Sequence, residues 1–399
     1  MIIREGYLKR LIDTKDTEFI KVITGIKRCG KSTLLLMFKD YLVNSGIKED
    51  DIIYMNFESA KFDDIKDYKD LYNYVKERIK NERVYLLLDE VQNIKAFEKA
   101  INSFKVDFDI DIYITGSNAY LLSSELSTLL SGRYIEIKIY PLSFKEYLKF
   151  NDYDNSNLED KFNEYLKYGG LPAITLIKNN DELVLSYLND IYSTIVKKDI
   201  IDRNNIKDVA LLENIIKYLA TNIGSSVSAK KISDFLNSNK ITEKSNHQTI
   251  DNYLNMLEKS FIMYKADRTD VRSKALLKTF GKYYIADTGI RNIIVGFRNI
   301  DEGYLLENVV YLELLRRGYK VNIGKSGDYE VDFVAESPND IKYYQVARTL
   351  AYDEIRKREV RSLESINDNY EKTILTMDKS INNDFNGIKV VNIIDWLLE

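Results

Sequence analysis

Residues 22–38 read VITGIKRCGKSTLLLMF, and the pattern G-x-x-x-x-G-K-S runs from Gly25 to Ser32. The apolar stretch before the pattern, EFIKVIT, is typical of a buried strand, and the stretch after it, STLLLMFKDYL, is typical of a helix. A glycine-rich turn between a strand and a helix points several backbone N–H groups at one place, where they can bind phosphates. The sequence therefore predicts a P-loop inside an α/β fold with a parallel sheet.

The loop residues have separate expected roles in binding a nucleotide. Lys31 neutralises the β- and γ-phosphates, and the hydroxyl of Ser32 completes the coordination of Mg²⁺. Arg28 either touches phosphate or faces solvent, and we favour solvent. ATP and Mg²⁺ are thus the expected cofactors, and the loop residues expected to bind them are Gly25, Ile26, Lys27, Arg28, Cys29, Gly30, Lys31, Ser32 and Thr33.

A second apolar strand, in RVYLLLDEVQNI, ends in two acidic residues, Asp89 and Glu90. We expect Asp89 to hold the Mg²⁺, directly or through water, and Glu90 to polarise the attacking water as the catalytic base. Acidic residues also end strands for structural reasons, but their position after a P-loop favours the catalytic interpretation. No guanine-binding pattern of the N-K-x-D type follows the strands, so adenine is expected in preference to guanine.

Bulk composition narrows the class of protein. The 399 residues are 45% hydrophobic and 30% charged, which indicates a globular protein of several domains. No apolar run approaches the roughly 20 residues of a spanning helix, so we expect no membrane association and a cytoplasmic location. The single cysteine, Cys29, excludes an intramolecular disulfide, and the single histidine makes zinc chemistry improbable. The net charge is −4, so any contact with nucleic acid is expected only in a basic segment of the chain.

The motifs together resemble those of prokaryotic AAA-type ATPases with a C-terminal domain of unknown function. The first half contributes VITGIKRCGKSTLL, LLLDEVQNI, ITGSNAYLLSSELSTLLSGRY and YPLSFKEYL, and the second half contributes YGGLPA, YYIADTGIRN, GYLLENVVYLELLRRGYKV, EVDFVA and YYQVARTL. The resemblance implies four parts: an AAA+ domain, a helical lid, a winged helix and a degenerate α/β domain similar to restriction-endonuclease folds. The expected boundaries are 1–145, 146–205, 206–282 and 283–399.

The AAA+ resemblance implies two further positions near the nucleotide. Ser117 or Asn118, at the end of the strand in DIDIYITGSNAYLL, lies where AAA+ enzymes place a γ-phosphate sensor, although Ser-Asn also forms ordinary turns. Arg133, in LLSGRYIEIKIYPL, is a candidate arginine finger for a neighbouring subunit, with a structural salt bridge as the alternative. The expected catalytic residues are therefore Glu90, Lys31, Arg133 and Asn118.

The middle of the chain has the element order of a winged helix. DVALLENIIKYLATNIGSSVSAKKISDFLN predicts two helices, the second beginning near Ser228, and TEKSNHQTIDNYLNMLEKSFIMYKADR predicts a recognition helix at about 246–259 followed by strands. Residues 225–282 contain eleven Lys or Arg and six Asp or Glu, which favours DNA contact over a purely structural role. The candidate DNA contacts are Lys244, His247, Gln248, Lys259, Arg268 and Arg272.

The C-terminal domain resembles a PD-(D/E)xK nuclease that lacks its lysine. In that superfamily an acid on a helix joins an acid and a Glu or Gln on two strands to bind Mg²⁺, and a lysine two positions later activates water. The corresponding residues are Glu307, Asp332 and Gln345, whereas the lysine position holds Ala347. Arg348 follows, but it faces the other side of a strand. The resemblance therefore implies a nuclease fold without full nuclease chemistry.

Three functional hypotheses remain open from the sequence. The leading one is an Mg²⁺-dependent AAA+ ATPase whose nucleotide state controls engagement of double-stranded DNA or of an unknown protein partner, with ATP bound across the subunits of a homo-oligomer. The second is an ATP-gated DNA nuclease in which another residue replaces the missing lysine. The third is a nucleotide-switched oligomeric scaffold that binds no nucleic acid.

Overall fold

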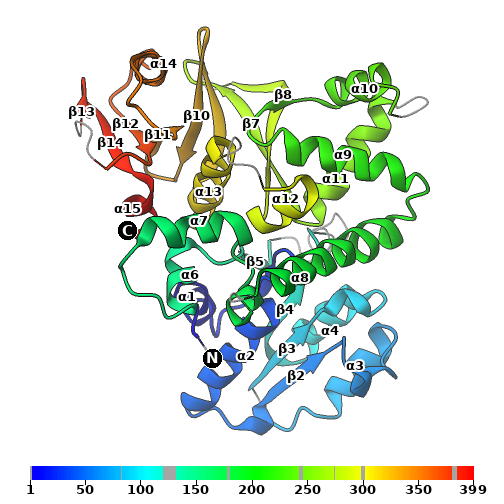
Figure 1. Ribbon diagram of the computed structural model, residues 1–399. Coiled ribbons are helices and arrows are strands. Elements are labelled where there is room, and N and C mark those ends of the chain that lie inside the picture. Colours follow the sequence, from blue (N-terminus) through cyan, green and yellow to red (C-terminus); the bar gives the residue numbers. More distant parts are fainter. Residues whose placement is uncertain are drawn as a thin grey trace. The chain divides into compact units, whose positions relative to one another are not determined.

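The structure, a computed structural model, describes residues 2–81, 83–119, 132–177, 180–241, 246–273, 275–297, 302–379 and 384–399 (Figure 1). The chain divides into two compact units. The first comprises Met1–Tyr140 with Lys259–Phe261, and the second comprises Pro141–Glu258 with Ile262–Glu399. No helix among the described residues is long and apolar enough to cross a membrane.

The first unit contains a five-stranded sheet with the order β2-β3-β4-β1-β5, and every neighbouring pair is parallel. Buried side chains occupy both faces of β1, β3 and β4, as the largely apolar sequences of these strands predict. Its elements are α1 (Glu5–Asp13), β1 (Ile20–Thr24), α2 (Lys31–Asn44), η1 (Glu49–Asp51), β2 (Ile52–Asn56), η2 (Ala60–Phe62), α3 (Tyr68–Lys76), β3 (Arg83–Asp89), η3 (Val91–Asn93), α4 (Phe97–Asp107), β4 (Asp109–Gly116) and β5 (Tyr134–Lys138).

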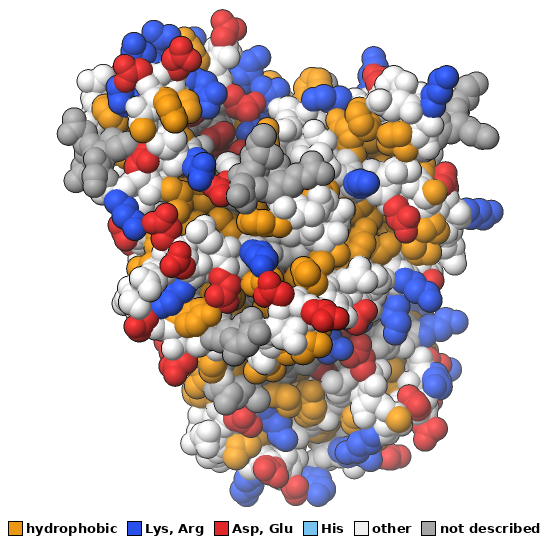
Figure 2. All heavy atoms as spheres, in the orientation of Figure 1, with side chains coloured by type: hydrophobic (Ala, Val, Ile, Leu, Met, Phe, Trp, Pro, Cys, Tyr) orange, Lys and Arg blue, Asp and Glu red, His pale blue; other side chains and the backbone are white. Residues whose placement is uncertain are grey.

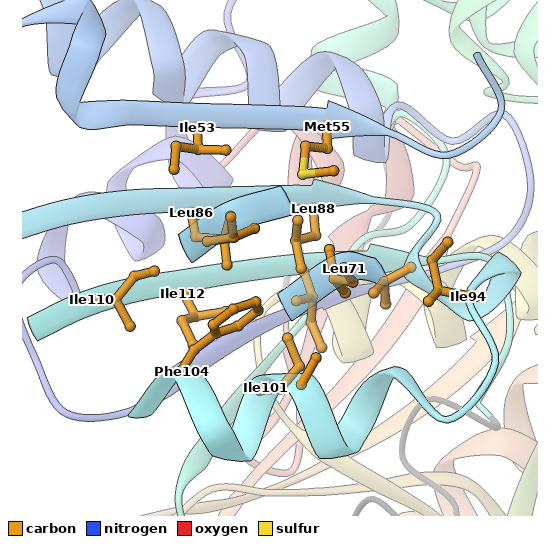
Figure 3. Packing of buried hydrophobic residues seen from close by; sticks show 14 of the residues in the cluster. Ile53, Met55, Leu71, Leu86, Leu88, Ile94, Ile101, Phe104, Ile110 and Ile112 are labelled. Carbon is orange, nitrogen blue, oxygen red and sulfur yellow. The ribbon is translucent and has the colours of Figure 1, made fainter. Parts of the chain in front are cut away.

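The core under one face of this sheet fixes the strands that carry the site (Figure 3). Leu86 and Leu88 of β3 and Ile112 of β4 pack against Ile101 and Phe104 of α4. Alternate residues of each strand point to the same face, so a shift of one residue would move this whole set away from α4 to the other face of the sheet. Since β1, β3 and β4 are parallel, their carboxyl ends meet at one edge of the sheet, where the predicted nucleotide residues follow.

The second unit begins with helices. These are α6 (Phe144–Phe150), α7 (Leu158–Tyr168), η5 (Pro172–Leu176), α8 (Asp181–Thr194), the π-helix η6 (Ile195–Asp202), α9 (Val209–Thr221), α10 (Ala229–Ser238) and α11 (His247–Lys259). The helix α11 coincides with the recognition helix expected at 246–259, and Ser228 is the N-cap of α10. Residues 146–205 are largely helical, while their role as a lid stays a prediction.

A nine-stranded sheet forms the rest of the second unit, with the order β13-β14-β12-β11-β10-β9-β7-β8-β6. Its strands and flanking helices are β6 (Ser226–Val227), β7 (Met263–Asp270), β8 (Leu276–Ile285), α12 (Thr288–Val295), α13 (Glu302–Arg316), β9 (Lys320–Ser326), β10 (Tyr329–Glu336), β11 (Ile341–Ala347), α14 (Asp353–Glu364), β12 (Glu371–Thr376), β13 (Asp384–Phe385), β14 (Ile388–Asn392) and α15 (Ile393–Leu398). The strands β10 and β11 form the expected antiparallel pair.

The sheet is continuous across the expected boundary between residues 282 and 283. That boundary falls inside β8, whose partner β7 pairs in parallel with β9. Pairing of β7 with β9 places Arg268 opposite Ile323 and Thr269 opposite Gly324. Hydrogen bonds therefore join the strands expected to belong to a winged helix to the strands of the C-terminal region.

The two glycine motifs YGGLPA and ADTGIRN meet around the buried carboxylate of Asp287. This side chain accepts hydrogen bonds from the backbone N–H of Gly170 at 2.7 Å and of Ile290 at 3.1 Å, and it caps α12. A Cβ at Gly169 would lie 2.1 Å from its Oδ1, and a Cβ at Gly289 would lie 2.1 Å from the carbonyl oxygen of Tyr168. These motifs therefore serve packing, because only glycines allow the approach.

Replacing Asp287 by Ala is expected to lower the free energy of unfolding by about 2–3 kcal/mol, because buried N–H groups lose their acceptor. Burial raises the pKa of Asp287 to about 6 from an ordinary 3.8, against the hydrogen bonds it accepts. The folded state therefore holds this proton more tightly, and the stability that Asp287 contributes falls as pH rises from about 4 through 6. Urea unfolding should therefore show that Asp287→Ala lowers the free energy of unfolding by about 1 kcal/mol more at pH 5 than at pH 8. An equal decrease at both pH values would contradict the raised pKa of Asp287.

Candidate nucleotide-binding site

The loop between β1 and α2 has a backbone that requires its glycines. Gly25 has φ 146° and Gly30 has φ 104°, both in the region that favours glycine. A Cβ at Gly25 would lie 2.2 Å from the carbonyl oxygen of Ile139, so a larger residue would displace the loop. Gly30 is the N-cap of α2 and offers no side-chain oxygen to the first N–H groups of that helix. These groups can therefore serve an anion instead.

Lys31 is the buried cation of the loop. Its side chain is 3% exposed, and its Nζ donates to the carbonyl oxygens of Gly25 at 3.1 Å and Ile26 at 3.2 Å. These bonds hold the ammonium inside the curve of the loop. Arg28, by contrast, is exposed with φ 68°, which agrees with the solvent-facing interpretation.

Asp89 stands at the carboxyl end of β3 beside the first turn of α2. The Ser32 hydroxyl donates to its Oδ1 at 3.1 Å, so the two predicted Mg²⁺ ligands lie side by side. Carboxylate and hydroxyl oxygens are ligands that Mg²⁺ prefers, and the pair therefore fits this ion. Burial raises the pKa of Asp89, although hydrogen bonds from the hydroxyls of Thr115 and Ser32 oppose that rise.

Three further side chains position Asp89, and the sequence did not single them out. Asn56 of β2 donates to Asp89 Oδ2 at 3.0 Å, and the Tyr54 hydroxyl donates to the same oxygen at 3.4 Å. The Thr115 hydroxyl of β4 donates to Asp89 Oδ1. The signal available in the sequence was only that these residues lie near the ends of strands, which is common to many polar residues.

Glu90 has a left-handed backbone, φ 54°, that turns its side chain away from the strand direction. Its N–H donates to the Thr115 hydroxyl at 2.9 Å, and its Oε1 lies 3.9 Å from Lys31 Nζ. Gln92 donates through its Nε2 to Glu90 Oε2. The Gln92 Oε1 is buried and has no hydrogen-bond partner among the described residues, so it is available to accept from a water molecule. Gln92 is a positioning residue that sequence reasoning missed.

Ser117 and Asn118 follow β4 at the same edge of the sheet and are 3% and 1% exposed. Burial at this edge agrees with a position near the nucleotide, while the role of Asn118 as a sensor stays a prediction. Residues 120–131, which precede Arg133, lie outside the described part of the chain.

Arg133 lies at the opposite edge of the sheet from its own P-loop. It directly precedes β5, and its carbonyl oxygen accepts from the Ile20 N–H, at the start of β1, at 2.8 Å. The five residues of β1 separate it from the loop by about 16 Å. Arg133 also lines a pocket of about 510 Å³ with Arg83, Lys105 and Asp109. A contact with its own nucleotide is thereby excluded, and a contact with another copy stays a prediction.

An arginine near the N-terminus, Arg4, binds the backbone of the loop between β1 and α2. The buried Arg4 donates through Nη1 to the carbonyl oxygens of Cys29 at 3.0 Å and Tyr140 at 2.9 Å. Its guanidinium lies 4.6 Å from the centre of the Tyr7 ring. An arginine 25 residues away in sequence carries no pattern that would have revealed this contact.

Cys29 is fully buried, and burial raises the pKa of its thiol. We therefore expect alkylation of the native protein to be at least about tenfold slower than in urea, because the thiolate is the reactive form. ATP should slow labelling further by holding the loop closed over the thiol. Mass spectrometry after timed iodoacetamide treatment measures both effects. Equal labelling rates in native buffer and in urea would contradict the burial of Cys29.

The candidate DNA contacts have different surroundings. His247, Gln248 and Arg272 are exposed, whereas Arg268 is half-buried with Nη2 3.8 Å from Glu330. Lys259 is exposed at the end of α11, and Lys244 lies outside the described residues. Figure 2 shows acidic and basic side chains interspersed over the face that it draws. Arg268 is thus the candidate least available to a phosphate.

The structure brings the three nuclease-like residues together. Glu307 comes from α13, Asp332 from β10 and Gln345 from β11. The Asp332 N–H donates to Gln345 Oε1 at 3.1 Å. Lys282 of β8 lies between the two acids, with Nζ 3.0 Å from Glu307 Oε1 and 3.5 Å from Asp332 Oδ1.

Two family models match this chain, one in its first half and one in the middle. Residues 17–148 match the family model of an AAA domain, and residues 159–301 match that of a domain of unknown function (DUF8612). An uncharacterized protein of Haemophilus influenzae is 44% identical over 403 residues, covering 100% of this chain and 99% of the relative. An uncharacterized protein of Methanocaldococcus jannaschii is 33% identical over 341 residues, covering 80% of this chain and 73% of the relative.

A solved structure shares the fold. The Walker-type ATPase of Pyrococcus abyssi superposes with a TM-score of 0.53 at 15% identity, covering 74% of this chain and 96% of that one. The match extends beyond the unit that holds the parallel sheet, since that unit is less than half of the chain and the match covers 74% of it. The chain therefore belongs to the family of AAA-domain proteins with a P-loop ATPase fold that includes the two relatives from H. influenzae and M. jannaschii.

Proposed function

We propose that the protein is an Mg²⁺-dependent ATPase whose nucleotide state controls its engagement of double-stranded DNA or of a protein partner. One observation supports this most strongly: a loop cation, a metal-ligand pair and a candidate base converge at one edge of the first sheet. Ser32 and Asp89 are 3.1 Å apart, and Lys31 and Glu90 are 3.9 Å apart. A cytoplasmic location accords with such a role.

Each residue of this site has a task in hydrolysis. The backbone N–H groups of the loop and the Lys31 ammonium bind and neutralise the phosphates. Ser32 and Asp89 would hold Mg²⁺, which supplies positive charge against the phosphate oxygens when bound. Glu90 accepts a proton from the attacking water, and Gln92 holds the Glu90 carboxylate in place.

Engagement of DNA is proposed for the middle region. The order α9, β6, α10, α11, β7, β8 supports a winged helix in this region, because helices precede a pair of strands. In this interpretation α11 is the recognition helix, with His247 and Gln248 in its exposed first turn. Arg272, in the exposed turn after β7, would contact phosphates. The helices within 146–205 would act as the lid, and the C-terminal strands as a degenerate nuclease-like layer.

Steady-state ATP turnover with and without duplex DNA, at low and physiological salt, tests this proposal. Stimulation of several-fold that weakens with salt, and that is lost on Arg272→Ala, would support DNA as the working ligand. Lys9→Ala is a matched control, since it removes an exposed lysine of the first unit that pairs with Asp13 at 2.7 Å. Turnover without stimulation would overturn the DNA part and favour a protein partner or a self-assembled switch.

Arg133→Ala is expected to lower turnover by about 10³-fold while nucleotide binding is retained, if the arginine serves a neighbouring copy. Mixing provides the decisive measurement. A Lys31→Ala subunit keeps a functional Arg133, and an Arg133→Ala subunit keeps a functional loop. Mixed oligomers should therefore recover part of the lost turnover. Wild-type turnover by a monomeric Arg133→Ala variant would remove Arg133 from catalysis.

A further inference from the structure

A buried lysine occupies the middle of a carboxylate cluster in the second unit. Lys282 Nζ lies 3.0 Å from Glu307 Oε1, 3.0 Å from Glu330 Oε1 and 3.5 Å from Asp332 Oδ1. Its side chain is 5% exposed. Three carboxylates from α13 and β10 thus surround one ammonium from β8. Burial opposes the charge of Lys282, but the carboxylates of Glu307, Asp332 and Glu330 outweigh it and raise its pKa.

Further hydrogen bonds join the cluster to the residues around it. Asp332 Oδ2 accepts from the Val346 N–H at 3.0 Å, and the Tyr284 hydroxyl donates to Glu307 Oε1 at 2.6 Å. Gln345 accepts from the Asp332 N–H and donates to Glu359 Oε2 at 2.6 Å. Gln345, the third predicted metal ligand, is therefore engaged in hydrogen bonds to Asp332 and Glu359. The cluster resembles a closed ion network more than an open coordination site.

The residues present do not fit the divalent metal that a nuclease-like fold implies. A metal would have to approach the oxygens of Glu307 and Asp332 to about 2.0–2.6 Å. An ammonium already lies 3.0 and 3.5 Å from these oxygens, and its charge would repel a second cation there. With Lys282 in its place between these acids, no group of three or more His, Cys, Asp or Glu among the described residues has a geometry that could hold a metal ion.

We infer that the ammonium of Lys282 is the resident cation of this cluster and stands where a divalent metal stands in nuclease folds. Lys282 thereby neutralises the two acids, Glu307 and Asp332, that such a metal would otherwise bind. The cluster therefore cleaves no phosphodiester, and its task is to join β8 to α13 and β10. The inference concerns the second unit alone, so it is independent of the proposed ATPase.

Removing the lysine should uncover a metal site. In Lys282→Met, the carboxyl groups of Glu307, Glu330 and Asp332 lose the ammonium that lies between them, and hard oxygen donors of this kind bind Mn²⁺. Isothermal titration of Mn²⁺ into the nucleotide-free full chain should find one more bound ion than in wild type. Lys282→Met/Asp332→Asn is the matched control, and it should lose that ion again. The P-loop is the same in every variant and contributes an equal background.

Two results would overturn the inference. One is a folded Lys282→Met variant that binds no additional Mn²⁺. The other is wild-type protein whose Mn²⁺ binding falls on Asp332→Asn alone, since a metal would then share the site with Lys282. This second comparison needs no Lys282 variant and so decides the matter even if Lys282→Met does not fold. Equal Mn²⁺ binding by wild type and Asp332→Asn, with equal absence of plasmid nicking in Mn²⁺, supports the inference.

Discussion

Glu90→Gln should bind ATP with unchanged affinity and hydrolyse it about 10²–10⁴ times more slowly. The amide has the size of the carboxylate but cannot accept the proton of the attacking water. Glu90 stands at the same sheet edge as Asp89, and its Oε1 is 3.9 Å from the Lys31 ammonium. Because binding of the phosphates depends on Lys31 and the loop, the loss should appear in the chemical step alone.

Single-turnover hydrolysis, together with equilibrium titration of ATP, separates these two effects. Glu58→Gln is the matched control. Glu58 is an acid near the same loop, 3.6 Å from Lys27, but its side chain is 54% exposed. Its neutralisation should leave turnover within about twofold of wild type, since exposed ion pairs contribute little. Hydrolysis at the wild-type rate in Glu90→Gln would remove Glu90 from the role of base.

Lys31→Ala should weaken ATP binding by about 10²–10³-fold, because charge-assisted hydrogen bonds to the phosphates are lost from a buried position. The ammonium is held by the carbonyl oxygens of Gly25 and Ile26, so it is already oriented before nucleotide arrives. Pre-orientation lowers the entropy that binding must overcome, which makes the loss on truncation larger.

Isothermal titration with ATP, after circular dichroism has confirmed that the variant is folded, measures this loss. Lys39→Ala removes a lysine from the same helix, α2, more than two turns further on, and should bind ATP as wild type does. Micromolar affinity retained in Lys31→Ala would refute the assigned phosphate site.

The parts of the fold that the sequence predicted are those determined by local pattern. The strands β1, β3 and β4 are short, largely apolar segments, and α2 follows a glycine turn, so each can be located without knowledge of its neighbours. The ends of parallel strands then predict which polar residues meet. Ser32 and Asp89 are 57 residues apart in the chain, yet their contact follows from this rule.

The parts that the sequence did not predict depend on contacts without a local pattern. Lys282 is 50 residues from Asp332 and belongs to a different strand from the one on which a nuclease lysine is expected. Nothing in its own neighbourhood, FGKYYIAD, distinguishes it from an exposed lysine of a hairpin. Arg4 is a comparable case. It reaches the Cys29 carbonyl oxygen only because α1, which Arg4 precedes, packs beside the loop.

The continuous sheet has a consequence for how the chain can be cut. A fragment that ends at residue 282 would divide β8, leave backbone groups of β7 without their partners in β8 and β9, and lack Glu307 and Asp332, which contact Lys282. Exposed strand edges of this kind promote aggregation. Since β7 is hydrogen-bonded to β9 within one sheet of nine strands, a displacement of the hairpin β7–β8 would strain its bonds to the C-terminal strands. The second unit therefore cannot be truncated at residue 282 without losing the strand pairs that hold its sheet together.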